Sequence, residues 1–166
     1  MTPDQSIRST EALLAHAIEI EREAALRYAE LGERMRDLGN DVVAELFLRL
    51  ARLERAHLQT LEKRATGMRL PQIARGEYAW LGDCAPETAH ELVLSLLTPH
   101  SALKVTLQAE KRALAFFESV RVRAVDPALA ALAGEMAAEE GVHVAWVQSA
   151  LRRTPDPVID WDAIFG

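Results

Sequence analysis

Apolar residues recur at three- and four-residue steps over four long stretches of the chain, which is the period of an amphipathic α-helix. The four stretches cover about residues 11–38, 41–65, 99–123 and 127–153. Ser9 or Thr10 can cap the first stretch, and Gly39 is the residue type that commonly ends a helix. Asp126 followed by Pro127 is typical of the first positions of a helix. The pattern therefore predicts four long helices.

A poorly periodic connection, residues 66–98, separates the second predicted helix from the third, with a short helical piece near 88–97. A connection of this length inside a compact domain is typical of a crossover between distant helix ends. Two long helices, a crossover and two more helices predict an all-α fold, an antiparallel four-helix bundle with one long crossover. The tail, residues 154–166, is predicted to be irregular and docked on the bundle by Val158, Trp161 and Phe165.

Composition narrows the class of protein without identifying a function. The 166 residues are 49% apolar, which is enough for one globular domain with a substantial core. A net charge of −6 argues against a nucleic-acid partner. Cys84 is the single cysteine, so the chain has no intrachain disulfide and no CxxC pair. No apolar run is long enough to cross a membrane and "MTPDQSIRST" does not resemble a signal peptide, so we expect a cytoplasmic protein with no membrane partner.

Each predicted helix carries one glutamate in the middle of its apolar face. These residues are Glu21, Glu54, Glu110 and Glu140. Two of the helices add a histidine three residues later, His57 and His143, which places it beside its glutamate on the helix surface. A buried carboxylate without a partner costs several kcal/mol. The glutamates are therefore expected to find their partners in one another's neighbourhood.

The two halves of the chain repeat this arrangement. "EREAALRY" at 21–28 corresponds to "EKRALAFF" at 110–117, each a glutamate followed seven residues later by an aromatic residue. "LERAHLQTL" at 53–61 corresponds to "EEGVHVAWV" at 139–147, each with Glu-x-x-His. The offsets of 89 and 86 residues (110 − 21 and 140 − 54) are nearly equal. The repeat indicates one helical hairpin used twice, and the bundle is expected to have four carboxylates and two imidazoles at one level.

Four carboxylates crowded into a dry core repel one another, and two divalent cations would balance their charge. Carboxylate and imidazole ligands suit iron or manganese. The predicted metal ligands are Glu21, Glu54, His57, Glu110, Glu140 and His143.

A lone Glu-x-x-His is weak evidence for a metal site. The third example, Glu87 with His90, falls in the crossover without a counterpart and is interpreted as a solvated pair. Glu139 competes with Glu140, but only Glu140 matches the spacing of Glu54 and His57. Tyr28 is interpreted either as a core aromatic or as a hydrogen-bond donor or electron relay at the site.

At these residues the sequence resembles the ferritin-like superfamily, most closely its rubrerythrin-related branch of di-iron carboxylate proteins. The resemblance covers nearly the whole chain up to about residue 153. It implies a ferritin-like bundle in which Glu54 and Glu140 bridge two iron ions, with manganese as the alternative metal. Glu21 and Glu110 would be terminal ligands, and each histidine would supply one nitrogen to one metal. A homodimer would be typical of the resemblance.

Three departures from the family pattern limit what the resemblance implies. Rubrerythrins usually carry a second carboxylate one turn after the third-helix glutamate, where this chain has Ala113. The rubredoxin-type CxxC pairs are absent, so electrons would come from a separate donor protein. Bacterioferritins have a haem methionine directly after the second-helix glutamate, where this chain has Arg55, so no haem is expected.

The resemblance implies a non-haem di-iron oxidoreductase that reduces H2O2 or O2 and oxidises Fe(II), in the manner of a rubrerythrin-like peroxidase or a ferroxidase. Three alternatives stay open at this point: an iron-storage or iron-handling protein, a di-manganese catalase-like enzyme, and a helical scaffold whose polar core only fixes helix register. The scaffold alone predicts thermal stability that is indifferent to metal.

Overall fold

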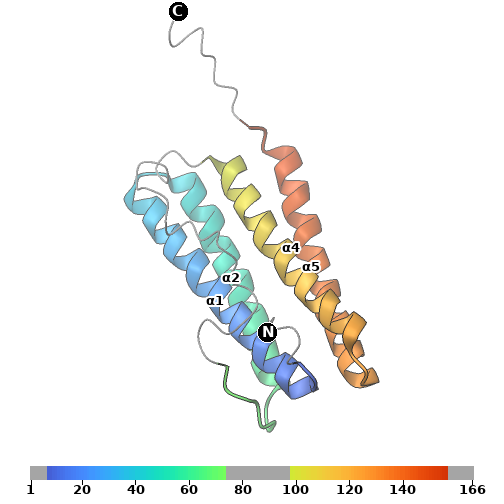
Figure 1. Cartoon of the computed structure of the whole chain (residues 1–166). Coiled ribbons are helices and arrows are strands. Elements are labelled where there is room, and N and C mark those ends of the chain that lie inside the picture. The colour runs from blue at the N-terminus through green and yellow to red at the C-terminus, as the bar shows by residue number, and fades with distance from the viewer. Residues whose placement is uncertain (1–6, 74–97, 157–166) are drawn as a thin grey trace, which may run out of the picture.

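The computed structural model describes residues 7–73 and 98–156, which form four long α-helices (Figure 1). The helices are α1 (Thr10–Asp37), α2 (Asp41–Arg64), α4 (Pro99–Arg123) and α5 (Pro127–Arg153). No strand occurs in these two ranges, and the all-α four-helix fold predicted from the sequence is confirmed. The predicted short helix near 88–97, Cys84, the Glu87/His90 pair and the tail residues Val158, Trp161 and Phe165 lie outside the described residues.

The helix ends follow local capping chemistry. The Ser9 hydroxyl accepts a hydrogen bond from the Ala12 amide at 3.1 Å, so Ser9 rather than Thr10 caps α1. Gly39 has a φ of 75°, a left-handed conformation that suits glycine and lets the chain turn sharply from α1 into α2. The Asp126 carboxylate accepts from the Ala128 amide at 3.0 Å at the start of α5. These bonds satisfy amides that the first turn of a helix leaves without an intrahelical partner.

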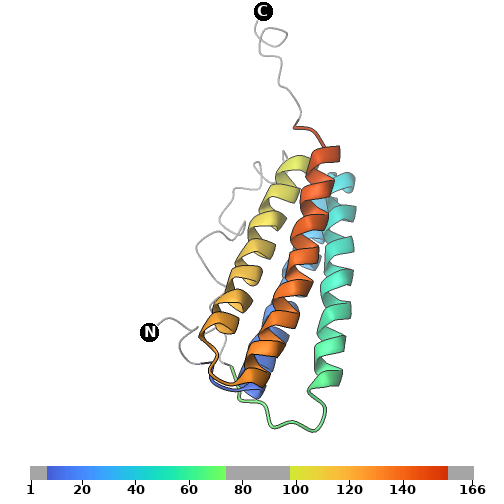
Figure 2. The same ribbon diagram turned by 90° about the vertical axis from the view of Figure 1, so that its right-hand side faces the viewer.

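The bundle consists of two antiparallel hairpins, α1 with α2 and α4 with α5, lying side by side (Figures 1 and 2). Helices α2 and α4 run in the same direction, so the end of α2 and the start of α4 lie at opposite ends of the bundle. The two helices are therefore joined between opposite ends of the bundle, as the one-crossover topology requires. Of the helices described, none is long and apolar enough to span a membrane.

The core is divided into two apolar clusters, and the four glutamates separate them. One cluster consists of buried residues from the N-terminal half of α1, the end of α2, the second half of α4 and the first half of α5. Leu13 and Phe117 are fully buried in it. The other cluster consists of residues from the second half of α1, the first half of α2 and the start of α4 (Ala102), with Met35 and Phe47 fully buried. In each helix the glutamate lies beside or between the segments that supply these clusters, so the polar groups form one layer across the bundle.

Two large apolar side chains of the helices are not covered by their neighbours. Leu53 on α2 is 43% exposed, and Trp146 on α5 is 37% exposed. Both side chains lie on the side of the bundle where α2 faces α5, and both line a cavity there. The stripe of an amphipathic helix is wider than the part that its neighbours cover, so the sequence alone did not separate these edge positions from the core.

Candidate metal centre

Every helix contributes one buried glutamate to the polar layer. Glu54, Glu110 and Glu140 are each 4% exposed and Glu21 is 6% exposed. Glu139 is exposed to solvent, which decides in favour of Glu140 as the inward carboxylate of α5. His57 and His143, one turn after Glu54 and Glu140, are half-buried at the edge of the same layer. The structure thus brings together all six residues that the sequence singled out.

Direct contacts connect the two hairpins through this layer. The Tyr28 hydroxyl donates a hydrogen bond to Glu110 Oε1 at 3.0 Å, and His143 Nδ1 lies 3.3 Å from Glu110 Oε2. His143 Nδ1 also lies 3.6 Å from Glu140 Oε2. Tyr28, from α1, therefore fixes one oxygen of Glu110, from α4, while the imidazole from α5 faces the other oxygen.

The two imidazoles stack across the space between α2 and α5. The ring centroids of His57 and His143 are 4.5 Å apart, with 13° between the ring planes. Ligand atoms of Glu54, His57 and His143 lie within 4.8 Å of one another, and so do those of Glu110, Glu140 and His143. In the two described ranges these are the groups of acidic and histidine side chains close enough to share a metal ion. They overlap at His143, so they form one cluster.

Burial strongly perturbs the acidity of the carboxyls. Desolvation is the largest cause that raises the pKa of Glu21 to about 8, of Glu54 to about 10 and of Glu140 to about 9. The negative charge of Glu110 adds to the rise for each of the three. A hydrogen bond between the Glu21 and Glu54 carboxyls raises the pKa of Glu54 and lowers that of Glu21, as expected when Glu54 holds the proton. Burial therefore favours the protonated forms of Glu21, Glu54 and Glu140 when no metal is bound.

The surroundings shift the pKa values of the two imidazoles in opposite directions. Burial and the neighbouring His143 lower the pKa of His57. Burial also lowers the pKa of His143, but the hydrogen bond to Glu110 and the charge of Glu54 outweigh it, so the net shift is upward. Two stacked rings cannot both carry a proton at low cost, and the ring that contacts the carboxylates keeps it. Tyr28 stays neutral because burial raises its pKa well above the ordinary value.

The donor set fits divalent metal ions. The charge of four carboxylates buried in one layer is what a pair of divalent cations would balance, and a bound cation would replace the protons that burial favours on Glu21, Glu54 and Glu140. Carboxylate oxygen and imidazole nitrogen are ligands that iron and manganese accept. Ala113, the position one turn after Glu110, is buried at 2% exposure and offers no further carboxylate. Among the described residues of α4, Glu110 is therefore the one carboxyl in the layer.

A cavity of about 260 Å³ leads from the surface to this cluster between α2 and α5. Its inner end is formed by Glu54, Glu110 and His143. Its walls are apolar and consist of Leu50, Leu53, Val142, Trp146 and Val147. Helical periodicity does not indicate this cavity. The available signal in the sequence is that Leu53 directly precedes Glu54 and that Trp146 follows His143 by three residues.

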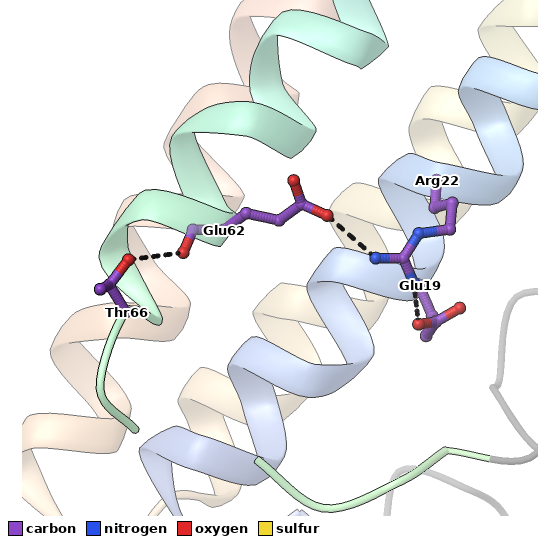
Figure 3. A network of polar contacts seen from close by, with 4 residues as sticks. All are labelled: Glu19, Arg22, Glu62 and Thr66. Atoms are coloured by element: carbon purple, nitrogen blue, oxygen red, sulfur yellow. Dashed lines mark hydrogen bonds and ion pairs between the residues drawn. The ribbon is translucent and has the colours of Figure 1, made fainter. Parts of the chain in front are cut away.

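A larger groove of about 710 Å³ lies elsewhere, between α1, the end of α2 and residues 70–73. Its charged residues are already paired: Arg22 donates to Glu19 on its own helix and to Glu62 on α2 at 3.0 Å (Figure 3). Thr66 donates to the backbone carbonyl of Glu62 at 3.3 Å, at the end of the same helix (Figure 3). This network links α1 to α2. The groove is lined by none of the six residues of the polar layer.

Comparison with known proteins agrees with this geometry. The sequence model of the rubrerythrin family matches residues 12–145, which include all four glutamates and both histidines. The chain belongs to the rubrerythrin family. Among solved structures, this rubrerythrin-family chain is similar to an uncharacterized conserved protein from Magnetospirillum magnetotacticum MS-1, with 32% sequence identity and a TM-score of 0.74. The match covers 91% of this chain and 99% of the other. None of the proteins with curated functions matches the chain closely enough to count as a relative.

The family predicted from the glutamate and histidine spacing is thus confirmed. A rubrerythrin-family bundle with a buried carboxylate–histidine cluster has a candidate metal-binding site.

Proposed function

We propose that the chain is a non-haem di-iron oxidoreductase that reduces a peroxide or O2 with electrons from a separate donor protein. One observation carries the proposal: four buried glutamates from four helices and two stacked histidines meet in a single layer of an otherwise apolar core. Such a layer is costly unless the charges are balanced. The homodimer and the donor protein implied by the family resemblance stay predictions.

In line with the family resemblance, Glu54 and Glu140 would be the central carboxylates that hold two ions, with Glu21 and Glu110 as the outer carboxylates. His57 and His143 would each supply one nitrogen. When bound, the two iron ions would supply two reducing electrons and Lewis-acid positions for an oxygen substrate. Manganese fits the same donor set, and iron is proposed because it changes oxidation state readily in the chemistry that the family resemblance implies.

The chain's own residues prepare the site for this role. Tyr28 donates to Glu110 Oε1 and so leaves Oε2 facing His143. The raised pKa values of Glu54 and Glu140 mean that these groups take up protons when metal leaves and release them when metal binds. Apolar side chains on both sides of the layer keep bulk water away, which strengthens the electrostatic interactions of the carboxyls.

Counting bound iron tests the proposal directly. Metal-free protein is mixed with Fe(II) without oxygen, excess metal is removed, and iron per chain is measured for the native chain, Glu140→Ala and Glu139→Ala. The last variant is the matched control, because Glu139 is adjacent but exposed. We expect two irons in the native chain and the control and a loss in Glu140→Ala. The loaded native protein is then exposed to H2O2 or O2, and oxidation of its iron is followed by absorbance.

The possible results separate the candidate functions. Two irons that are oxidised and can be reduced again support the oxidoreductase. Uptake of many irons per chain would favour storage instead. Iron near zero, with a melting temperature that Fe(II) does not change, would refute the metal centre and leave a helical scaffold.

A further inference from the structure

The cavity between α2 and α5 is larger and more apolar than an inorganic oxidant requires. Its volume of about 260 Å³ is equivalent to roughly nine water molecules at ~30 Å³ each in the liquid. H2O2 and O2 contain two heavy atoms. The cavity has one polar end, formed by Glu54, Glu110 and His143, and five apolar residues line the rest. Its shape therefore suits a molecule with a small oxygen-containing head and a hydrocarbon body.

We infer that this cavity binds the hydrocarbon part of an organic hydroperoxide, so that an alkyl or aryl hydroperoxide is the substrate of the candidate metal centre. The inference rests on the proposed function, which it deepens by naming the substrate class. The hydroperoxide group would lie at the carboxylate and imidazole end, and the alkyl or aryl group would contact Leu53, Val142 and Trp146. Apolar pockets with a few polar groups at one point are the usual form of a small-molecule site.

The mouth of the cavity supports a ligand that enters from solvent. Leu53, Val142 and Trp146 are 43%, 67% and 37% exposed, so apolar side chains continue from the surface to the polar layer. A surface that served only to contact a second chain would not need a cavity reaching two buried carboxyls. The indole of Trp146 offers a flat apolar wall against which an aryl group can pack.

The reaction balances with the electrons that the proposed function supplies. The O–O bond of ROOH breaks, two electrons and two protons are taken up, and the products are ROH and H2O. In turnover the electrons come from the donor protein; in the test below they come from two Fe(II) ions that become Fe(III). The protons come from solvent.

The test measures how fast two oxidants, an organic hydroperoxide and H2O2, oxidise the iron of the native protein and of two variants. Val142→Phe narrows the cavity, and Val122→Phe is the matched control, since Val122 is a similarly exposed valine on α4 outside it. Native protein and both variants are loaded with Fe(II) and oxidised with cumene hydroperoxide or with H2O2 in a stopped-flow instrument. Independently, binding of the product alcohol, 2-phenyl-2-propanol, to the metal-free proteins is measured by calorimetry.

We expect Val142→Phe to lower the ratio of the cumene hydroperoxide rate to the H2O2 rate by about tenfold, as when a hydrophobic pocket loses room for a methylene group. It should weaken alcohol binding by a similar factor, whereas Val122→Phe should change neither.

Equal rate ratios in both variants, or no alcohol binding to the native protein, would overturn the inference. The proposed function would still stand in that case if H2O2 oxidised the bound iron. A dimer that dissociates in Val142→Phe with an unchanged rate ratio would show the cavity mouth to be a subunit interface and would also overturn it. Absence of bound iron would refute the proposed function and this inference together.

Discussion

The stability of the metal-free protein should fall as pH rises through neutrality. The pKa values of Glu21, Glu54 and Glu140 are raised from 4.5 to about 8, 10 and 9 in the folded state. Between 4.5 and these values the folded chain holds protons that the unfolded chain has lost. The stabilisation is complete below the unfolded pKa and is lost as pH rises toward the folded pKa, so the free energy of unfolding decreases over this interval.

The magnitude follows from the number of protons retained. Each additional proton in the folded state lowers the free energy of unfolding by about 1.4 kcal/mol per pH unit. One shared proton therefore gives a slope of about 1.4 kcal/mol per pH unit, and three independent ones would give about 4. The carboxyls are close enough to share protons, so the slope should fall between these limits. Total stabilities of domains are roughly 5–15 kcal/mol, so such a slope is easily measured.

Urea unfolding followed by circular dichroism, with a chelator present, measures this slope between about pH 5.5 and about pH 7.5. The double variant Glu54→Gln with Glu140→Gln removes two of the titrating groups and should flatten it. Saturating Mn(II) should reverse its sign in the native chain, because metal binds the deprotonated carboxylates and binds more tightly as pH rises. A metal-free native chain whose stability stays level or increases over this interval would show that the carboxyls are not protonated in the fold, and the reasoning would be wrong.

Three further substitutions test a hydrogen bond of the site and the packing of the helices. Tyr28→Phe removes the donor to buried Glu110 Oε1 and should lower the stability of the metal-free protein by about 1–3 kcal/mol in urea unfolding; an unchanged stability would mean that the 3.0 Å contact is replaced at no cost. Gly32→Ala should destabilise the protein, because a Cβ there would lie 2.6 Å from Leu48 Cγ. Gly141→Ala has open space around its Cβ and should stabilise α5 by up to about 1 kcal/mol. Thermal unfolding of the two variants and the native chain measures both effects. Equal shifts in both glycine variants would contradict the close approach of α1 and α2.

Much of the fold was predictable because its signals are local. Gly39 and Asp126 terminate or start helices through the backbone conformation and hydrogen bond that each residue type favours, and the structure shows both. The polar layer was predictable for a related reason: a glutamate on an apolar helical face is costly, so four of them at matching positions indicate one shared environment. The structure places all four within the core.

The remaining features depend on distances between helices, which no single helix encodes. The pairing of Tyr28 with Glu110 joins residues 82 positions apart and required the two hairpins to be docked. The exposure of Leu53 and Trp146 depends on how closely α2 and α5 approach each other at that level. Helical periodicity gives the direction of a side chain around its own axis but not whether a neighbour covers it.

The division of the bundle into two hairpins has a consequence for how the molecule assembles. Each hairpin packs far more extensively on itself than on the other hairpin, so each can form through contacts that are short-range in sequence. Each hairpin holds two of the four glutamates and one of the two histidines. Docking of the hairpins therefore buries the four acidic groups together, and neither half of the chain carries the candidate metal centre alone. We expect the association of the two halves to depend more strongly on the concentrations of protons and of divalent metal than the formation of either half does.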